Sequence, residues 1–527
     1  MHRLTCTCLN RRHATGWLAL ALLASQARAQ GNVAAPVGRS GLPSLGDAGA
    51  MTTLEERKLG DAIIRELYRD PDYIDDPVVG EYVDGIWRAL LAAARARGEL
   101  PAELDERYAW QVLLGRDRSI NAFALPGGYF GLHLGLVGAV ASRDELASVL
   151  AHELVHITQR HIPRLLSAQD RQAPLLLAAM VLGAIAASKN PQAGAALAVG
   201  GQAAVIQQQL NFSRDMEREA DRIGYGVMTQ AGFAGQGFVS MFEKLQAASR
   251  INDNSDWPYL RSHPLTTQRI ADMQQRQQSL VRQAPPVDLE AALVAGRARA
   301  LSRPGVDVLR AWAGEPAQPG FASRPLAQRA GALYAAALAQ AQLRDLPKAQ
   351  ALATQLALAV TGDGPAAQQA RLLQAELALQ AGEPAQVLKL LSGAPRPASA
   401  DVQGQAGRAA LLLRAQALVG TGQATEAAGA LQTWVSDHPR DAGAWQALAQ
   451  AHGAAGRTLR ALRAEGEVPM AHMDYAGAVD RWRAAQDFSR RQPGDNADLI
   501  EASIVDTRLR AAQAALKQQQ LDEMKRR

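Results

Sequence analysis

The chain has 527 residues, of which 48% are hydrophobic, 20% charged and 5% aromatic. This composition is typical of a folded protein with more than one domain and excludes a mainly disordered chain. The formal net charge is +5, but residues 1–29 contain four arginines and no acidic residue, and the rest of the chain carries 52 basic and 51 acidic side chains. Bulk charge therefore predicts no nucleic-acid partner.

The N-terminal 29 residues have the pattern of a secretory signal peptide. Arg11 and Arg12 precede a short apolar run over 17–24, and the small-residue pattern Ala27-Arg28-Ala29 follows it. The run is shorter than the ~20 residues that cross a bilayer, so an uncleaved anchor is the less favoured alternative. We expect cleavage near Ala29 and export to the bacterial periplasm. The only cysteines, Cys6 and Cys8, lie in this leader, which excludes a disulfide framework and a cysteine-ligated metal site in the remainder.

After a flexible lead-in over residues 30–50, residues 51–284 predict a mainly helical domain with a small β-sheet. The Thr53 and Glu56 pair predicts the start of a helix with a capping box. Further helices are expected over 77–97, from Ser142 and from Ser213, and short strands over 108–114 and 122–134. Residues 284–286 (Ala-Pro-Pro) indicate a linker at the end of this domain.

An apolar insertion over residues 174–206 interrupts this domain. It consists of two apolar segments separated by a polar break, and each segment is too short to span a membrane. Three roles remain open for it: a cover over the functional site, a peripheral contact with a membrane or an unfolded substrate, and a buried helical hairpin.

Residues 290–515 predict an α-solenoid of tetratricopeptide-like repeats. Turn signals recur at Gly382, Gly422 and Gly456, at spacings of 40 and 34 residues. The clearest unit has residues of the expected types at the expected spacing, namely Trp445, Leu448, Ala449, His452, Gly456 and Ala461. Stacked helix pairs would bury a shared core and present a surface for a protein partner. The alternative is an alanine-rich helical bundle without a repeat.

The sequence His152-Glu153-Leu154-Val155-His156 lies in the helix expected from Ser142. The two histidines fall on one face of the helix, one turn apart, so both imidazoles can bind one ion. Glu153 is placed to reach a water molecule on that ion, which is the arrangement of zinc hydrolases. Zinc lowers the pKa of such a water towards ~7, and the glutamate takes its proton. We expect one Zn²⁺ per chain, with Glu153 as the general base.

The third ligand is expected from a second helix. His161 lies nine residues after His152 and would point about 180° away on an ideal helix, so we expect a structural role for it. Glu217 and Asp221 share a helix face, so that Glu217 can bind the ion while Asp221 accepts the free N–H of a ligand imidazole. Glu219 is the rival ligand. The alternative is a solvated acidic helix face.

Four segments carry a family resemblance. The HELVH helix, the EREAD helix (217–221), the preceding NAFALPGGYFGLHLGL (121–136) and the following RSHPLTTQRIADM (261–273) resemble the HtpX-related zinc metalloproteases, a group that includes the CAAX prenyl proteases. The resemblance covers about Glu55 to Arg282. It implies zinc ligands at His152, His156 and Glu217, with Glu153 as general base. This sequence lacks the long transmembrane helices of the membrane-embedded members, which argues against prenyl-protein substrates.

With a leader in front and repeats behind, the whole layout is similar to the BepA-like family of beta-barrel assembly-enhancing proteases. That similarity implies degradation of misassembled outer-membrane proteins in the periplasm, with work alongside the barrel-assembly machinery through the repeats. The leading interpretation is thus a periplasmic zinc endopeptidase. The alternative is a periplasmic chaperone or adaptor whose metal site is structural or degenerate. Glu153 argues against it, because a structural site needs no base there.

Two further features bear on substrate binding and control. Asn121 to Leu134 is expected to form an edge strand that binds an extended substrate, with Asn121 and Ala124 on the strand and Gly127 and Gly128 allowing close approach of the substrate backbone. The alternative is an internal turn. His263 precedes Pro264 and is therefore expected in a loop, where it acts as an inhibitory fourth ligand, donates to the oxyanion, or caps the segment from Thr266. We favour the inhibitory role.

Overall fold

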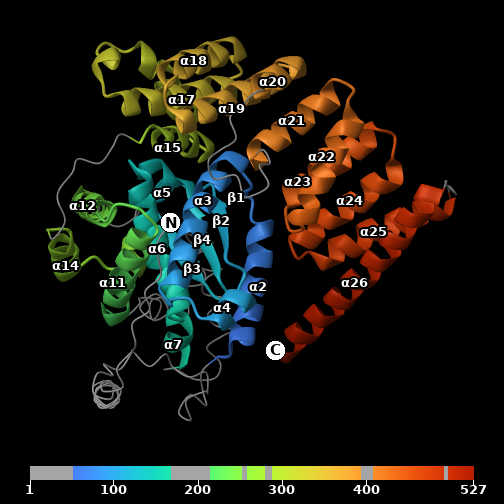
Figure 1. Ribbon diagram of the computed structural model, residues 1–527, viewed down its shortest axis with the longest axis horizontal. Helices are drawn as coiled ribbons and strands as arrows, with labels where there is room; N and C mark the ends of the chain where they lie inside the picture. Colours follow the sequence, from blue (N-terminus) through green and yellow to red (C-terminus); the bar gives the residue numbers. More distant parts are fainter. Residues whose placement is uncertain are drawn as a thin grey trace, which may run out of the picture. The chain divides into compact units, whose positions relative to one another are not determined.

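The computed structural model describes residues 51–167, 214–251, 258–278, 288–392, 407–491 and 496–526 (Figure 1). It confirms the predicted architecture, a mainly helical chain with one small sheet followed by a series of paired helices consistent with repeats. The predicted signal peptide (1–29), the predicted lead-in (30–50) and the apolar insertion (174–206) lie outside the described residues. Within the described ranges, no helix is both long and apolar enough to cross a membrane.

The sheet has four strands in the order β1-β2-β4-β3. The strands are β1 (Tyr73–Ile74), β2 (Gln111–Gly115), β3 (Ala122–Leu125) and β4 (Tyr129–His133). β2 and β4 run parallel, and the other two pairs are antiparallel. Both strand regions were therefore predicted, except that β2 begins only at Gln111, after α4 (Ala102–Arg107) and the left-handed Trp110 (φ 50°), and that the two-residue β1 was missed. Because β3 lies at the end of the sheet, its outer side faces away from the other strands.

The first helix of the domain, α2 (Thr53–Arg69), begins one residue earlier than its predicted capping box implies. Thr52 is the N-cap, and its hydroxyl accepts the Glu55 N–H (3.2 Å) while the Glu55 carboxylate accepts the Thr52 N–H (2.8 Å). Glu56 is instead buried and accepts a hydrogen bond from the Tyr108 hydroxyl. The predicted pairing was wrong because two adjacent glutamates follow two adjacent threonines, and the sequence does not distinguish the two registers.

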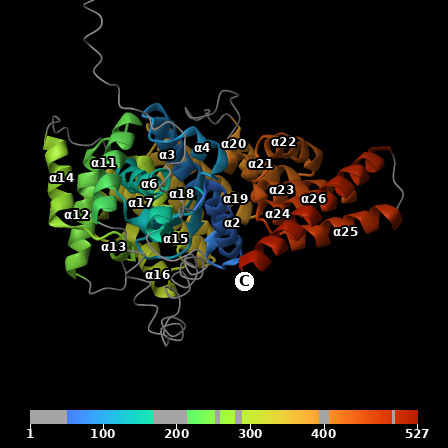
Figure 2. The same ribbon diagram turned by 90° about the horizontal axis from the view of Figure 1, so that it is seen from below.

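The central helix of the domain is α6 (Arg143–Thr158), whose residues from Glu145 to Thr158 are all buried. It packs against α3 (Pro77–Ala96), α11 (Arg214–Gln230), α12 (Gln236–Ile251) and β3. Figures 1 and 2 both show α6 and α11 side by side. Gly224 permits this close approach, since a Cβ atom there would lie 3.1 Å from the carbonyl oxygen of Ala151. The acidic end of α11 is thereby held against α6.

The second half of the described chain consists of successive helices that pack against their neighbours. They are α15 (Leu289–Leu301), α16 (Val306–Gly314), α17 (Leu326–Gln342), α18 (Leu346–Ala359), α19 (Gly364–Gln380), α20 (Pro384–Leu391), α21 (Arg408–Gly420), α22 (Ala424–Asp437), α23 (Ala442–Ala454), α24 (Thr458–Ala471), α25 (Tyr475–Arg491) and α26 (Asn496–Arg526). The recurring Gly382, Gly422 and Gly456 have φ values of 76°, 78° and 73°, which end the first helix of three pairs in the same left-handed conformation. The turn signals in the sequence therefore mark equivalent positions.

Helix α15 belongs to two cores at once. Ala291, Val294 and Ala298 pack into the hydrophobic core that surrounds α6, whereas Leu289 and Leu293 pack into the core of the following helices. The domain boundary that the sequence suggests, between 284 and 290, therefore precedes a helix that still contributes to the first core. A fragment ending near Pro285 would expose this apolar surface, so a stable fragment has to retain α15.

Candidate metal centre

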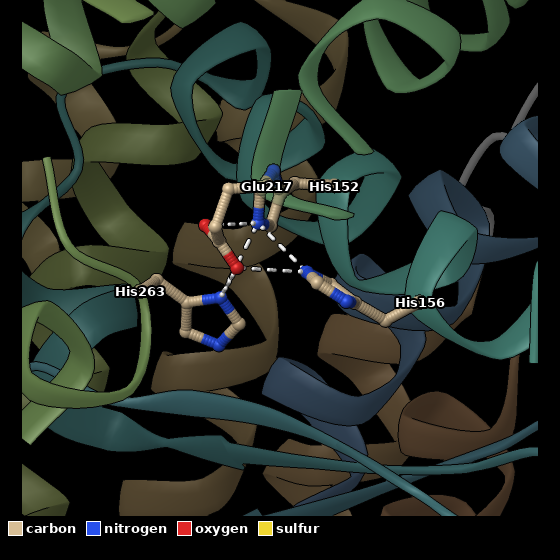
Figure 3. Close-up of side chains that lie close together, drawn as sticks. All are labelled: His152, His156, Glu217 and His263. Atoms are coloured by element: carbon tan, nitrogen blue, oxygen red, sulfur yellow. Dashed lines mark hydrogen bonds and ion pairs between the residues drawn. The ribbon is translucent and has the colours of Figure 1, made fainter. Parts of the chain in front are cut away.

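Four ligand-type side chains converge beneath α6, as Figure 3 shows. His152 and His156 come from α6, Glu217 from α11, and His263 from the loop after α13 (Pro258–Ser262). All four side chains are buried, and one potential ligand atom from each lies within 4.8 Å of the others. The periodicity of the helix explains the first pair, because residues four apart lie on one face.

The distances within this cluster are close to those between ligand atoms that bind one zinc ion. His152 Nε2 lies 3.0 Å from His156 Nε2, and the two carboxylate oxygens of Glu217 each lie 3.4 Å from one of these nitrogens. An ion about 2.0–2.1 Å from each ligand atom in a tetrahedron places the ligand atoms about 3.3–3.4 Å apart. Imidazole and carboxylate are also the ligand types that zinc accepts. Donor set and spacing thus agree with the zinc dependence expected from the motif.

Glu153 is fully buried beside the cluster but is not part of it. Its Oε2 accepts the backbone N–H of Ala124 in β3 (3.1 Å). Its Oε1 has no hydrogen-bond partner among the described residues and lies 3.3 Å from His263 Nε2. Burial raises the pKa of Glu153. A carboxylate with one anchored and one available oxygen, and with an increased tendency to hold a proton, can act as a base towards a water molecule at the site.

Asp221 and Arg269 hold two members of the cluster. His152 Nδ1 lies 2.9 Å from Asp221 Oδ1, which leaves Nε2 directed at the other ligands. Arg269 donates two hydrogen bonds to Asp221 (2.6 and 2.8 Å), and its Nη1 lies 2.7 Å from Glu217 Oε2. Burial alone would lower the pKa of His152, but Glu217 and Asp221 raise it to about 9. Asp221 therefore lies where the sequence placed it, whereas the arginine was missed.

In the sequence, a role for Arg269 is indicated only by the charge that the two carboxylates require. A pair of buried carboxylates one helical turn apart needs a cation, and Arg269 lies in the segment that also carries His263. Several other arginines lie nearby in the sequence, at Arg214, Arg218 and Arg222, so the pattern alone does not select one.

His161 and Glu219 lie outside the ligand cluster. Helix α6 ends at Thr158, and Arg160 has a φ of 51°, so His161 begins a new helix, α7 (His161–Ser167). His161 Nδ1 then lies 2.8 Å from His156 Nδ1, and His161 Nε2 lies 3.1 Å from Glu219 Oε2. The premise that His161 points about 180° away was wrong, because it assumed one continuous helix, whereas its expected role outside the ligand set agrees with the cluster. Glu219 contacts this second imidazole instead of the ligand atoms.

Of the segment proposed to bind substrate, residues 121–134, only β3 lies at the edge of the sheet, whereas β4 lies between β2 and β3. β3 is the edge strand beside α6, and Ala124 donates to Glu153 from it. The carbonyl of Asn121 accepts the His133 N–H, which ties it into the sheet. Gly127 and Gly128 have φ values of 76° and 82°, and a Cβ atom there would lie 2.8 Å from Arg57 Cα and 2.6 Å from Tyr108 Cβ, respectively.

The glycine turn is therefore filled by the chain's own residues. Both glycines are buried, and the side on which each would carry a Cβ atom is filled by α2 and by the segment before β2. This favours the alternative of an internal turn, and a role of Gly127 and Gly128 in substrate binding stays a prediction.

His263 lies in a loop, as Pro264 predicts. Its Nδ1 lies 3.3 Å from His152 Nε2 and 3.0 Å from Glu217 Oε1, and its ring stacks on Tyr259 (4.7 Å between centroids). Helix α14 (Thr267–Gln278) is capped by the Thr266 hydroxyl, which accepts the Arg269 N–H (3.2 Å). The cap of this helix does not involve His263, whose side chain faces the ligand cluster.

Comparison with known proteins agrees with this geometry. Residues 88–277 match the model of peptidase family M48. A Vibrio cholerae protein provisionally named beta-barrel assembly-enhancing protease is 36% identical over 323 residues, which are 60% of this chain and 63% of that protein. The Escherichia coli beta-barrel assembly-enhancing protease is 33% identical over 237 residues, or 45% of this chain and 47% of that protein.

A more distant relative is the mitochondrial metalloendopeptidase OMA1 of Saccharomyces cerevisiae, which is 28% identical over 196 residues, or 36% of this chain and 54% of that protein. The chain spans about half to just under two thirds of the length of these relatives. The matched family segment contains all four members of the cluster as well as Glu153.

Proposed function

We propose that this chain, a metallopeptidase of family M48, is a zinc-dependent endopeptidase with one Zn²⁺ per chain. The observation that carries this proposal is the convergence of the ligand atoms of His152, His156 and Glu217, at 3.0–3.4 Å, with the buried Glu153 beside them. The alternative from another class is a chaperone or adaptor with a structural or degenerate metal site. A closed structural site would leave no task for Glu153.

The chain's own residues divide the chemistry among them. His152, His156 and Glu217 would hold the ion, which when bound polarises a peptide carbonyl and lowers the pKa of a water molecule. Glu153 takes the proton of the attacking water on Oε1 and passes it to the leaving amine. Asp221 and Arg269 keep His152 and Glu217 oriented through their hydrogen bonds and ion pair. Burial of the site excludes bulk water, which strengthens each of these interactions.

The predicted leader suggests the compartment, and the resemblance to the beta-barrel assembly-enhancing proteases suggests the substrate and the partners. We propose that the chain acts in the periplasm after cleavage near Ala29 and degrades unfolded or misassembled outer-membrane proteins. The paired helices after residue 290 would dock to the barrel-assembly machinery and assist assembly. This is supported by the names of the relatives from Vibrio cholerae and Escherichia coli. The 174–206 insertion is proposed as a cover over the site or a peripheral membrane contact.

Removal of the metal distinguishes a peptidase from a chaperone or adaptor. The purified full chain should contain one zinc per chain and cleave casein, lose cleavage when a chelator removes the zinc, and regain it when zinc is restored. Analysis of the casein fragments should show cleavage at internal peptide bonds. A zinc-loaded chain that suppresses aggregation of an unfolded outer-membrane protein without cleaving it or casein would support the adaptor and contradict the peptidase.

His263→Ala should raise the rate of peptide cleavage at unchanged zinc content. His263 Nδ1 lies at the distance of a fourth ligand from His152 and Glu217, so the imidazole would occupy the position that a substrate needs. Casein cleavage and zinc analysis of the same preparation measure this, with Ser262→Ala, at the end of α13 directly before the loop, as control. A loss of about 100-fold would instead identify an oxyanion donor. Unchanged cleavage would identify a structural residue.

A further inference from the structure

His156, the second candidate zinc ligand on α6, contacts another imidazole through the ring nitrogen that faces away from the cluster. His156 Nε2 faces the ligand cluster, and its Nδ1 lies 2.8 Å from His161 Nδ1. His161 is fully buried, and its other nitrogen, Nε2, lies 3.1 Å from Glu219 Oε2. The three side chains thus form a line that runs from the cluster through two imidazoles to a carboxylate on α11.

When His156 binds an ion through Nε2, one combination of histidine tautomers allows a hydrogen bond at each of the two contacts. A ligating imidazole is neutral and carries its proton on the other nitrogen, so the His156 Nδ1–H has to donate. His161 Nδ1 must then be the acceptor, which places the His161 proton on Nε2. That N–H donates to the carboxylate of Glu219, which accepts only.

We propose that His161 and Glu219 are positioning residues that hold His156 in its ligating tautomer and ring orientation. The inference rests on the proposed zinc site and deepens it. His152 is held in the same way but directly, through Asp221 on α11. Glu219 lies two residues before Asp221 on the same helix, so one helix orients both imidazole ligands, His152 directly and His156 through His161.

The turn after α6 has the features needed to bring His161 to this place. Arg160 adopts a left-handed backbone conformation (φ 51°), which is uncommon for a residue other than glycine. Its side chain is fixed at both ends of the guanidinium, by Glu56 (3.1 Å) and by the carbonyl oxygen of Met51. Glu56 is buried and is also bonded by Tyr108. The anchored Arg160 therefore holds the break between α6 and α7, at which His161 comes beside His156.

The test compares three replacements of His161 in the full chain. His161→Phe fills the space of the ring but offers no acceptor, and we expect zinc affinity to fall by about 10–100-fold, the usual effect of losing such a partner. His161→Asn places an amide oxygen near the position of Nδ1, and zinc affinity should stay within a few-fold of wild type. Glu219→Ala should give a smaller loss than His161→Phe, because His161 keeps its bond to His156.

Competition with a chromogenic chelator gives the zinc affinities. Nitrogen NMR of the labelled histidines of the zinc-loaded wild type gives the tautomer directly, and His161 should carry its proton on Nε2 alone. This second measurement is independent of whether His161→Phe folds. His161→Phe with wild-type affinity, His161→Asn as weak as His161→Phe, or a proton on His161 Nδ1 would each overturn the inference. A wild type that binds no zinc would instead overturn the proposed function.

Discussion

Glu153→Gln should lower the rate of peptide cleavage by about 10²–10⁴-fold, the usual contribution of a general base, while the chain keeps its zinc. The glutamine retains the size of the side chain and can still accept the Ala124 N–H through its amide oxygen. It cannot take a proton from the attacking water. Because Glu153 lies beside the cluster and contributes none of its four ligand atoms, the metal site should be unaffected.

Cleavage of casein and zinc content measured on one preparation of each protein test this prediction. The wild type treated in parallel provides the reference for both quantities. Loss of zinc in Glu153→Gln would show that Glu153 is itself a ligand. Full cleavage with full zinc would show that another group acts as the base.

Glu217→Ala should weaken zinc binding by more than the roughly 100-fold that loss of an outer partner costs. Glu217 places both carboxylate oxygens 3.4 Å from a ligand nitrogen, so its removal leaves two imidazoles and His263 without the anionic ligand. Glu217→Gln should also weaken zinc binding, because an amide carries no negative charge. Asp221 and Arg269 keep their own ion pair and should preserve the fold around α11.

Asp215→Asn is the matched control for this change, since Asp215 lies on the same helix and its side chain is 83% exposed. Metal analysis after dialysis against a weak chelator should find zinc in Asp215→Asn and the wild type but not in the Glu217 variants. Full occupancy in Glu217→Ala would show that the third ligand had been assigned wrongly.

The parts of the site that could be predicted from the sequence are those determined by the 3.6-residue period of an α-helix. His152 and His156 are four residues apart, and so are Glu217 and Asp221, so each pair shares a face wherever the helix lies. The predicted start of a helix at Ser142 was correct, because Ser142 is the N-cap of α6 and its hydroxyl accepts the Glu145 N–H. These features need only local geometry.

The features that were missed depend on where a helix ends and on tertiary contacts. The position of His161 depends on the left-handed Arg160, whose conformation is stabilised by the distant Glu56, and no glycine in the sequence marks it. Arg344 has a φ of 68° in the turn between α17 and α18, where other helix pairs have a glycine, so the repeat signal is absent there. The dual packing of α15 likewise arises only when both cores are assembled.

The central claim is that one zinc ion is held by His152, His156 and Glu217. Anomalous diffraction at the zinc absorption edge, from crystals of the full chain, locates the ion without reference to activity. The account predicts one strong peak about 2.0–2.1 Å from the Nε2 atoms of both histidines and from a Glu217 oxygen. A peak at His161 and Glu219, or no peak in a chain that cleaves casein, would contradict it.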